Sequence, residues 1–173
     1  MENSSVIVIV MGLPGSGKTY FAQRLARALS AEHISSDQTR NEHRWRGQYG
    51  LSDKLAVYHA VVEQADEALA AGQSVVLDAT FHLEIFRRLV EDWANEKDYS
   101  IRYIEIIADE ATTRKRTRRS RSDSEADYRV YQQLKREAEP LEQAHLRLDS
   151  SDEDIDTMLQ RTLDYLTDDP RTI

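Results

Sequence analysis

The sequence predicts an α/β fold in which a five-stranded parallel sheet lies between two layers of helices. Short apolar runs alternate with amphipathic helical segments along the 173 residues. Strands that are apolar throughout are typical of parallel sheets covered on both faces. A glycine-rich loop joins the first apolar run to the first helical segment. The length suits one domain, and we expect it to cover residues 1–173.

Each element follows from its own pattern. Apolar runs predict strands, which we place at residues 6–11, 33–36, 74–78, 101–107 and 145–148. Apolar residues spaced three and four apart predict helices, which we place at residues 18–30, 83–96 and 126–138. A further helix begins with Ser52 or Asp53 as its cap and ends at Gly72, and the last helix opens at Ser151-x-x-Asp154.

Composition excludes several kinds of site and partner and indicates where the protein is located. The chain has no cysteine, which excludes a disulfide scaffold, a thiolate metal site and a cysteine nucleophile. The first residues lack a basic segment, and the apolar run after them is too short for a signal peptide or a membrane span, so we expect a cytoplasmic protein with no membrane partner. The net charge of −8 argues against a broad nucleic-acid surface.

The strongest motif is the complete phosphate-binding loop G-x-x-x-x-G-K-[ST] at residues 12–19. Its glycines let successive backbone N–H groups point at a phosphate, and the helix N-terminus adds partial positive charge there. Lys18 is expected to reach the β- and γ-phosphates of ATP, and the Thr19 hydroxyl is expected to bind Mg²⁺. The predicted nucleotide contacts in this segment are Gly12, Pro14, Gly15, Ser16, Gly17, Lys18, Thr19 and Tyr20.

Two acids follow strands and are expected at the same edge of the sheet. Asp37 is a candidate general base for an attacking hydroxyl, and Arg40 is a candidate for orienting an anionic acceptor. The alternative is that Asp37 caps a helix and that Arg40 is solvated. Asp78 is a candidate magnesium ligand through water, as a Walker-B acid is; its alternative is also a helix cap.

Basic residues gather at positions 114–121, after the fourth predicted strand. A charge run is most often a solvated face. Arginines on a flap over the nucleotide also stabilise the charge that develops during phosphoryl transfer. Because neighbouring residues point to different sides of a helix, two or three of them are expected to face the phosphates. The candidates are Arg116 with Arg119 or Arg121. His82 lies near the same cleft and has no assigned role.

These residues together resemble the P-loop kinases of the polynucleotide-kinase-like group, over essentially the whole chain. The resemblance rests on residues 12–19, Asp37-x-x-Arg40, residues 75–81, the arginine cluster, and Glu139-Pro140-Leu141 with the Ser124–Asp127 segment before it. It implies a P-loop NTPase fold of the adenylate-kinase-like type with an arginine-bearing lid at about residues 112–127. It also implies that Asp37 is the general base and that Arg40 contacts a phosphate of the acceptor.

The expected function is therefore that of an ATP- and Mg²⁺-dependent kinase that transfers the γ-phosphoryl group to a hydroxyl. The favoured acceptor is the 5′-hydroxyl of a polynucleotide, and the alternative is the hydroxyl of a metabolite, sugar or antibiotic. A nucleotide-hydrolysing switch or nucleotide-binding module is the alternative of another class. The sequence contains no N-K-x-D motif for guanine, and it leaves the oligomeric state open.

Overall fold

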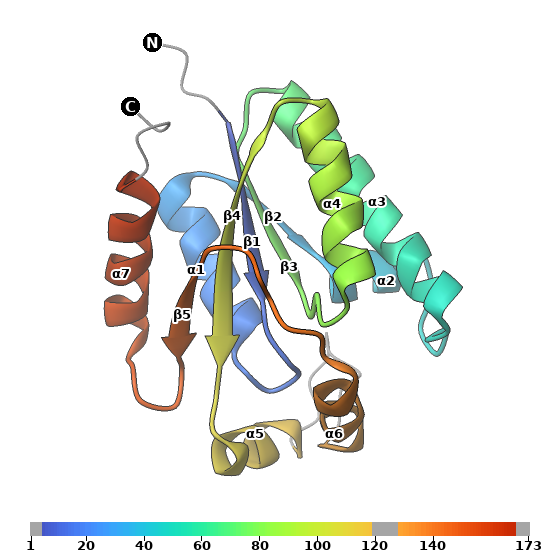
Figure 1. Ribbon diagram of the computed structural model, residues 1–173, viewed down its shortest axis with the longest axis vertical. Coiled ribbons are helices and arrows are strands. Elements are labelled where there is room, and N and C mark those ends of the chain that lie inside the picture. Colours follow the sequence, from blue (N-terminus) through green and yellow to red (C-terminus); the bar gives the residue numbers. More distant parts are fainter. Residues whose placement is uncertain (1–4, 119–127, 169–173) are drawn as a thin grey trace.

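Five parallel strands form the centre of the molecule (Figure 1). The computed structural model describes residues 5–118 and 128–168. The strands are β1 (Val6–Met11), β2 (Glu32–Ser35), β3 (Val75–Ala79), β4 (Ser100–Ile107) and β5 (His145–Asp149). Their order in the sheet is β2-β3-β1-β4-β5, and all neighbouring pairs are parallel. The predicted α/β fold with a five-stranded parallel sheet is therefore confirmed.

Helices cover both faces of the sheet, as Figure 1 shows. Helices α3 (Leu51–Ala70) and α4 (Glu84–Glu96) pack on the face that carries Ile7, Ile9 and Leu77. Helices α1 (Lys18–Leu29) and α7 (Ile155–Thr167) pack on the other face, against Val8, Val10 and Val76. Successive residues of a strand point to opposite faces, so an apolar side chain at every position is what a sheet buried on both sides requires.

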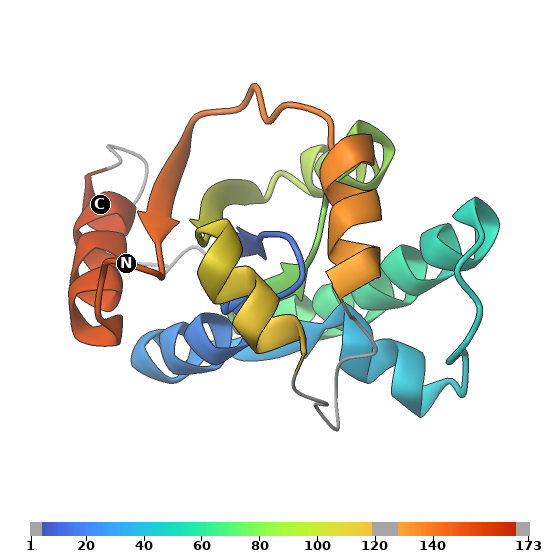
Figure 2. The ribbon, with the colours of Figure 1, turned by 90° about the horizontal axis from the view of Figure 1, so that it is seen from below.

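Three shorter helices lie near the carboxyl ends of the strands. Helix α2 (Ser36–Glu42) follows β2 directly, α5 (Glu110–Thr117) follows β4, and α6 (Tyr128–Glu137) precedes β5. Figure 2 looks at this end of the molecule, with α5 and α6 in front of the loop between β1 and α1. In parallel α/β sheets ligands bind beyond the carboxyl ends of the strands, so this end holds the candidate site.

Two predicted helix caps are wrong by a few residues. Helix α3 begins after Gly50, and Asp53 lies inside the helix, where its Oδ2 accepts a hydrogen bond from the Gly50 N–H at 3.0 Å. Helix α7 begins after Asp154, whose side chain accepts a hydrogen bond from the Thr157 N–H at 2.9 Å. Ser151 therefore lies before the helix rather than capping it. Asp53 and Asp154 therefore both take part in capping, but each occupies a different capping position from the one predicted.

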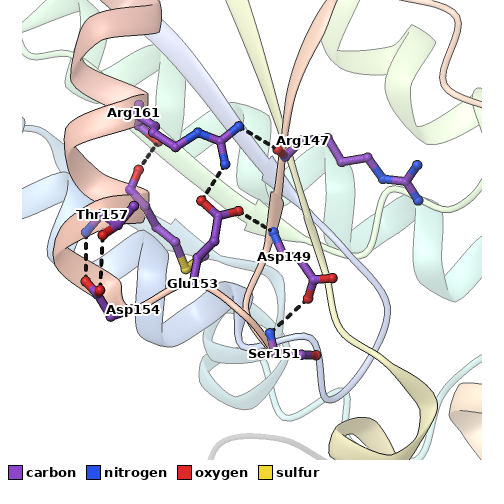
Figure 3. Close-up of polar contacts among 9 residues, drawn as sticks. Arg147, Asp149, Ser151, Glu153, Asp154, Thr157 and Arg161 are labelled. Atoms are coloured by element: carbon purple, nitrogen blue, oxygen red, sulfur yellow. Dashed lines mark hydrogen bonds and ion pairs between the residues drawn. The ribbon is translucent and has the colours of Figure 1, made fainter.

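The turn between β5 and α7 is closed by two acidic side chains (Figure 3). Asp149 accepts a hydrogen bond from the Ser151 N–H at 2.9 Å, and Glu153 accepts one from the Asp149 N–H at 3.0 Å. Glu153 also pairs with Arg161 of α7. Asp149, which ends a strand as Asp78 nearly does, thus shapes the turn beside the site.

A buried arginine ties the end of β3 to the segment after α6. Arg87 is 2% exposed, and its guanidinium donates to the carbonyl oxygens of Phe81 and Pro140, each at 2.8 Å. Phe81 has a left-handed backbone with φ of 48°, which non-glycine residues rarely adopt. The hydrogen bond from Arg87 helps to hold this turn, which places Thr80 and His82 at the candidate site.

Candidate active site

The phosphate-binding loop closes so tightly that glycine is required at two places. A Cβ on Gly12 would lie 2.4 Å from the carbonyl oxygen of Ile106. Gly15 has φ of 80°, and a Cβ there would lie 2.8 Å from the Cγ2 of Thr117. Gly17 precedes the first residue of α1, Lys18, in a left-handed conformation. The tight loop therefore leads directly into the N-terminus of α1, an arrangement that suits a phosphate group.

Three candidate catalytic residues from two elements line one cavity of about 260 Å³. Lys18 comes from the phosphate-binding loop, and Asp37 and Arg40 come from α2. Pro14 and Thr80 form part of the wall between them, and α6 contributes Val130, Gln133 and Leu134. The sequence predicted that Lys18, Asp37 and Arg40 would converge, and the structure brings them together.

Arg40 is positioned by the loop between α2 and α3. Its Nη1 donates to the carbonyl oxygen of Gln48 at 2.9 Å, and its guanidinium lies 4.9 Å from the ring centroid of Tyr49. Asp37 lies in the first turn of α2, and Ser35 occupies the capping position. The alternative in which Asp37 caps this helix is therefore wrong, and both side chains face the cavity.

Asp78 lies inside β3 rather than at a helix cap, with 1% of its surface exposed. Its Oδ2 lies 3.1 Å from Nε2 of His33, a neighbour on β2. Its Oδ1 is buried with no hydrogen-bond partner among the described residues. Asp78 shares its face of the sheet with Val76, which packs against α1, the helix that carries Thr19 in its first turn. A buried carboxylate oxygen without a partner, on the face covered by α1, fits a Mg²⁺ site, since Mg²⁺ prefers oxygen ligands.

Arg116 lies across the phosphate-binding loop. Its guanidinium donates to the carbonyl oxygen of Gly15 at 3.2 Å and to the Oγ of Ser150 at 2.8 Å. Ser150 in turn donates to the carbonyl oxygen of Ser16 at 2.6 Å. Arg116 therefore joins α5, the loop and the segment after β5. Arg119 and Arg121 lie outside the residues that the structure describes.

A cavity of about 330 Å³ opens beside this arginine, on the α7 side of the loop. Its lining includes Gly17, Tyr20, Arg116, Ser150 and Glu153. Tyr20 is 51% exposed, and the guanidinium of Arg24 lies 3.4 Å from its ring centroid. The guanidinium plane of Arg116 is a surface on which a planar base can stack.

Sequence reasoning missed two side chains of the cavity that holds Asp37. Lys54 and Tyr58 of α3 line this cavity, and His82, which was expected near the cleft without a role, lines it from the turn after β3. Burial raises the pKa of Tyr58 to about 12, so its phenol stays protonated, and its oxygen accepts the Phe81 N–H at 3.0 Å. Burial, with the nearby charge of Lys54, lowers the pKa of His82 to about 4. The helical spacing of Tyr58 indicates a core residue, the place of His82 after the third predicted strand puts it near the cleft, and no sequence signal singles out Lys54.

Comparison with known proteins assigns the family. The sequence profile of the AAA domain family matches residues 7–141. The chain belongs to the AAA domain family. The matched range includes the phosphate-binding loop and both candidate acids, and it ends after the segment that Arg87 holds.

Curated relatives share only part of this chain. The human 6-phosphofructo-2-kinase/fructose-2,6-bisphosphatase 3 is 25% identical over 129 residues, which are 65% of this chain and 25% of that protein. The chain therefore spans about a quarter of the length of this relative. An uncharacterized protein of Mycobacterium tuberculosis is 31% identical over 87 residues, or 43% of this chain and 18% of that protein.

Solved structures share the whole fold at low sequence identity. A sugar kinase from Janibacter sp. HTCC2649 has a TM-score of 0.74 at 18% identity, covering 97% of this chain and 98% of that one. The APS kinase of Mycobacterium tuberculosis in complex with AMPPNP and APS has a TM-score of 0.76 at 18% identity, covering 95% and 98%. These likenesses establish the P-loop kinase fold. Within residues 5–118 and 128–168, no helix has the length and apolar character needed to cross a membrane.

Proposed function

We propose that this protein is an ATP-dependent kinase that phosphorylates a hydroxyl group of a small molecule. The observation that carries the proposal is that Lys18 of the phosphate-binding loop and the carboxylate of Asp37 line the same cavity. Lys18 is the side chain that reaches the terminal phosphates of a nucleotide in such loops. A carboxylate in the same cavity supplies what a hydroxyl acceptor needs and a simple nucleotide switch does not.

The chemistry follows from these roles. Asp37 takes the proton of the acceptor hydroxyl while its oxygen attacks the γ-phosphorus of ATP. The bond from that phosphorus to the β–γ bridging oxygen breaks, which gives ADP and a phosphate ester. Lys18 and the loop N–H groups stabilise the charge on the phosphate oxygens. Mg²⁺ bound by Thr19 and Asp78 would neutralise further charge on the phosphates.

The nucleotide base belongs, in this proposal, to the cavity of about 330 Å³ beside Arg116. The guanidinium of Arg116 lies over Gly17, since a Cβ on that residue would be 3.3 Å from Nη1. From this position Arg116 can contact both a base and the phosphates. Arg119 and Arg121 complete the proposed nucleotide contacts. They belong to a lid at about residues 112–127 of one kinase domain, residues 1–173.

A small-molecule acceptor fits the findings better than the polynucleotide end that the sequence favoured. The cavity volume of about 260 Å³ is near the lower end of the range for small-molecule sites. The net charge of −8 is unfavourable for a polynucleotide. Solved neighbours in this fold include a sugar kinase and an APS kinase. The polynucleotide-kinase-like subtype remains a prediction, and a cytoplasmic location is part of this proposal.

The test is the fate of the γ-phosphoryl group. The protein is incubated with γ-labelled ATP, Mg²⁺ and either a metabolite panel or 5′-hydroxyl oligonucleotides. The proposal predicts label on a metabolite, and it predicts that Lys18→Ala removes most of this transfer. Label on the oligonucleotide alone, or release of free phosphate at a rate that no acceptor changes, would contradict it.

A further inference from the structure

We infer that the acceptor is a small polyhydroxylated anion, a sugar acid or a sugar phosphate, with Lys54 binding its anionic group and His82 binding a hydroxyl that does not react. This inference rests on the proposed function and names the substrate class of the same cavity. Three properties of the cavity lead to it: the sign of its charge, the lack of a partner for the Lys54 ammonium among the residues that the structure describes, and the Nε2 of His82, which is buried there without a hydrogen bond.

The charge of the cavity is opposite to that of the chain. Its lining holds three basic side chains, Lys18, Arg40 and Lys54, and one carboxylate, Asp37. The chain as a whole carries a net charge of −8. Local potential decides what enters a cleft, and a positive cleft concentrates anions. Lys18 is committed to ATP in the proposed mechanism, which leaves two cations for the acceptor.

The ammonium group of Lys54 has no structural contact that would explain its position, among the residues that the structure describes. Its side chain is half-buried on the first turns of α3, and no hydrogen bond or ion pair of its ammonium exists among the residues described. A shielded charge normally has a partner, because removing it from water is costly. Arg40, by contrast, is already held by Gln48 and Tyr49. An anionic group on the acceptor would supply the partner that Lys54 lacks.

His82 supplies a different contact. It is 3% exposed, its Nδ1 lies 3.3 Å from the Oγ1 of Thr80, and its backbone oxygen accepts the Glu139 N–H at 2.8 Å. Its Nε2 is buried without a hydrogen-bond partner in the described part of the chain, and Oε2 of Glu137 lies 3.8 Å away, within ion-pair range but too far for a hydrogen bond. Because its pKa is lowered to about 4, the ring is neutral at pH 7. A neutral ring nitrogen suits a hydroxyl, which donates or accepts according to the tautomer.

The position of His82 explains why this hydroxyl differs from the one that reacts. His82, Thr80 and Pro14 line the acceptor cavity and also a second cavity of about 450 Å³, whose lining includes Lys135 of α6. Asp37 lines only the first of the two. A ligand that reaches both Asp37 and His82 therefore needs at least two hydroxyl groups.

The experiment compares four matched acceptor sets with γ-labelled ATP: neutral polyols, sugar acids, sugar phosphates, and anions with a single hydroxyl such as 3-hydroxypropanoate. We expect kcat/KM for at least one anionic polyol to exceed that for its neutral counterpart by tenfold or more. Comparing acids with phosphates identifies the anionic group. Equal or better use of neutral polyols overturns this inference and leaves the proposed small-molecule kinase standing. Label on 5′-hydroxyl oligonucleotides only, or on no acceptor at all, overturns the proposed function as well.

Two variants test the assigned residues. Lys54→Met should raise KM for the anionic polyol at least tenfold and raise KM for ATP far less, whereas Lys97→Met on the distant end of α4 should change neither. His82→Phe keeps a ring against Phe86 and should lower the preference for the polyol over the single-hydroxyl anion at least fivefold. His82→Gln, which retains a hydrogen-bonding group, should recover part of that preference. If His82→Phe lowers kcat/KM for both acceptors by the same factor, the assignment of His82 is wrong.

Discussion

The guanidinium of Arg87 donates to the carbonyl oxygen of Pro140 at 2.8 Å, across 53 positions of the sequence. The same group donates to the carbonyl oxygen of Phe81 at 2.8 Å. Arg87 therefore joins the turn that carries Thr80 and His82 to the segment that follows α6. One buried side chain therefore connects the turn that lines the acceptor cavity to the segment whose Pro140 lines the cavity of about 450 Å³.

Arg87→Met should destabilise the fold by about 2–4 kcal/mol, because it leaves the buried carbonyl oxygen of Phe81 and the part-buried carbonyl oxygen of Pro140 without their donor. Urea unfolding followed by circular dichroism measures this. The neighbouring residue is the matched control: Arg88 is 69% exposed, and Glu84 on the same helix is its only ion-pair partner among the described residues. Arg88→Met should cost no more than about 0.5 kcal/mol. Equal losses for the two variants would show that Arg87 is not the connection described.

Asp78→Asn should raise the Mg²⁺ concentration that gives half-maximal activity by about tenfold or more, since the substitution removes the charge that the metal needs. Magnesium titrations of the labelled-ATP assay measure this value. Asp92→Asn, on the exposed face of α4, is the control and should leave the titration unchanged. An unaltered titration for Asp78→Asn would assign this acid to its hydrogen bond with His33 instead of to the metal.

Arg116→Ala should raise KM for ATP by roughly 10- to 100-fold, which corresponds to the loss of a charge-assisted contact of about 1.5–3 kcal/mol. Steady-state kinetics at saturating acceptor give this value. Lys115→Ala removes a neighbouring positive charge from an exposed position on the same helix and serves as the control. If both variants raise KM equally, general charge rather than the placement of Arg116 explains the effect.

His82 should make stability depend on pH in the weakly acidic range. Its folded-state pKa is about 4, below the ordinary value of 6.5. Between these values the unfolded chain binds a proton at this site and the folded chain does not, so stability is present above pH 6.5 and falls as the pH drops toward 4. The slope contributed is at most about 1.4 kcal/mol per pH unit. Unfolding of the protein and of His82→Gln between pH 7 and 4.5 should show a shallower slope for the variant; parallel curves would refute the shift.

Much of the fold was predictable because its signals are local. The five strands, the phosphate-binding loop and the helices on both faces follow from apolar spacing and from one motif within about 20 residues. The convergence of Lys18, Asp37 and Arg40 followed from a rule about where parallel strands end. The misplaced caps at Ser52 and Ser151 were local errors, because several candidate polar residues stand side by side there.

The rest depends on contacts between distant positions. His33 meets Asp78 across 45 positions, and Ser150 meets Ser16 across 134. Nothing around Arg87 distinguishes it from its exposed neighbour Arg88 in the sequence. Lys54 of α3 and His82 of the turn after β3 line the same cavity, and only the folded structure brings them together. The roles of such residues depend on which side chains lie next to them in the folded protein, and the spacing of residues along the sequence does not reveal this.

Asp37→Asn tests the central claim most directly, because it removes the proposed base while keeping the shape of the side chain. General-base catalysis contributes about 10²- to 10⁴-fold, so transfer of label from ATP to the acceptor should fall by at least 100-fold. Calorimetry with Mg²⁺ present should show ATP affinity within about threefold of the unaltered protein, since RT ln 3 is well below one charge-assisted contact. A variant that binds ATP and transfers phosphate at a rate close to that of the unaltered protein would contradict the account.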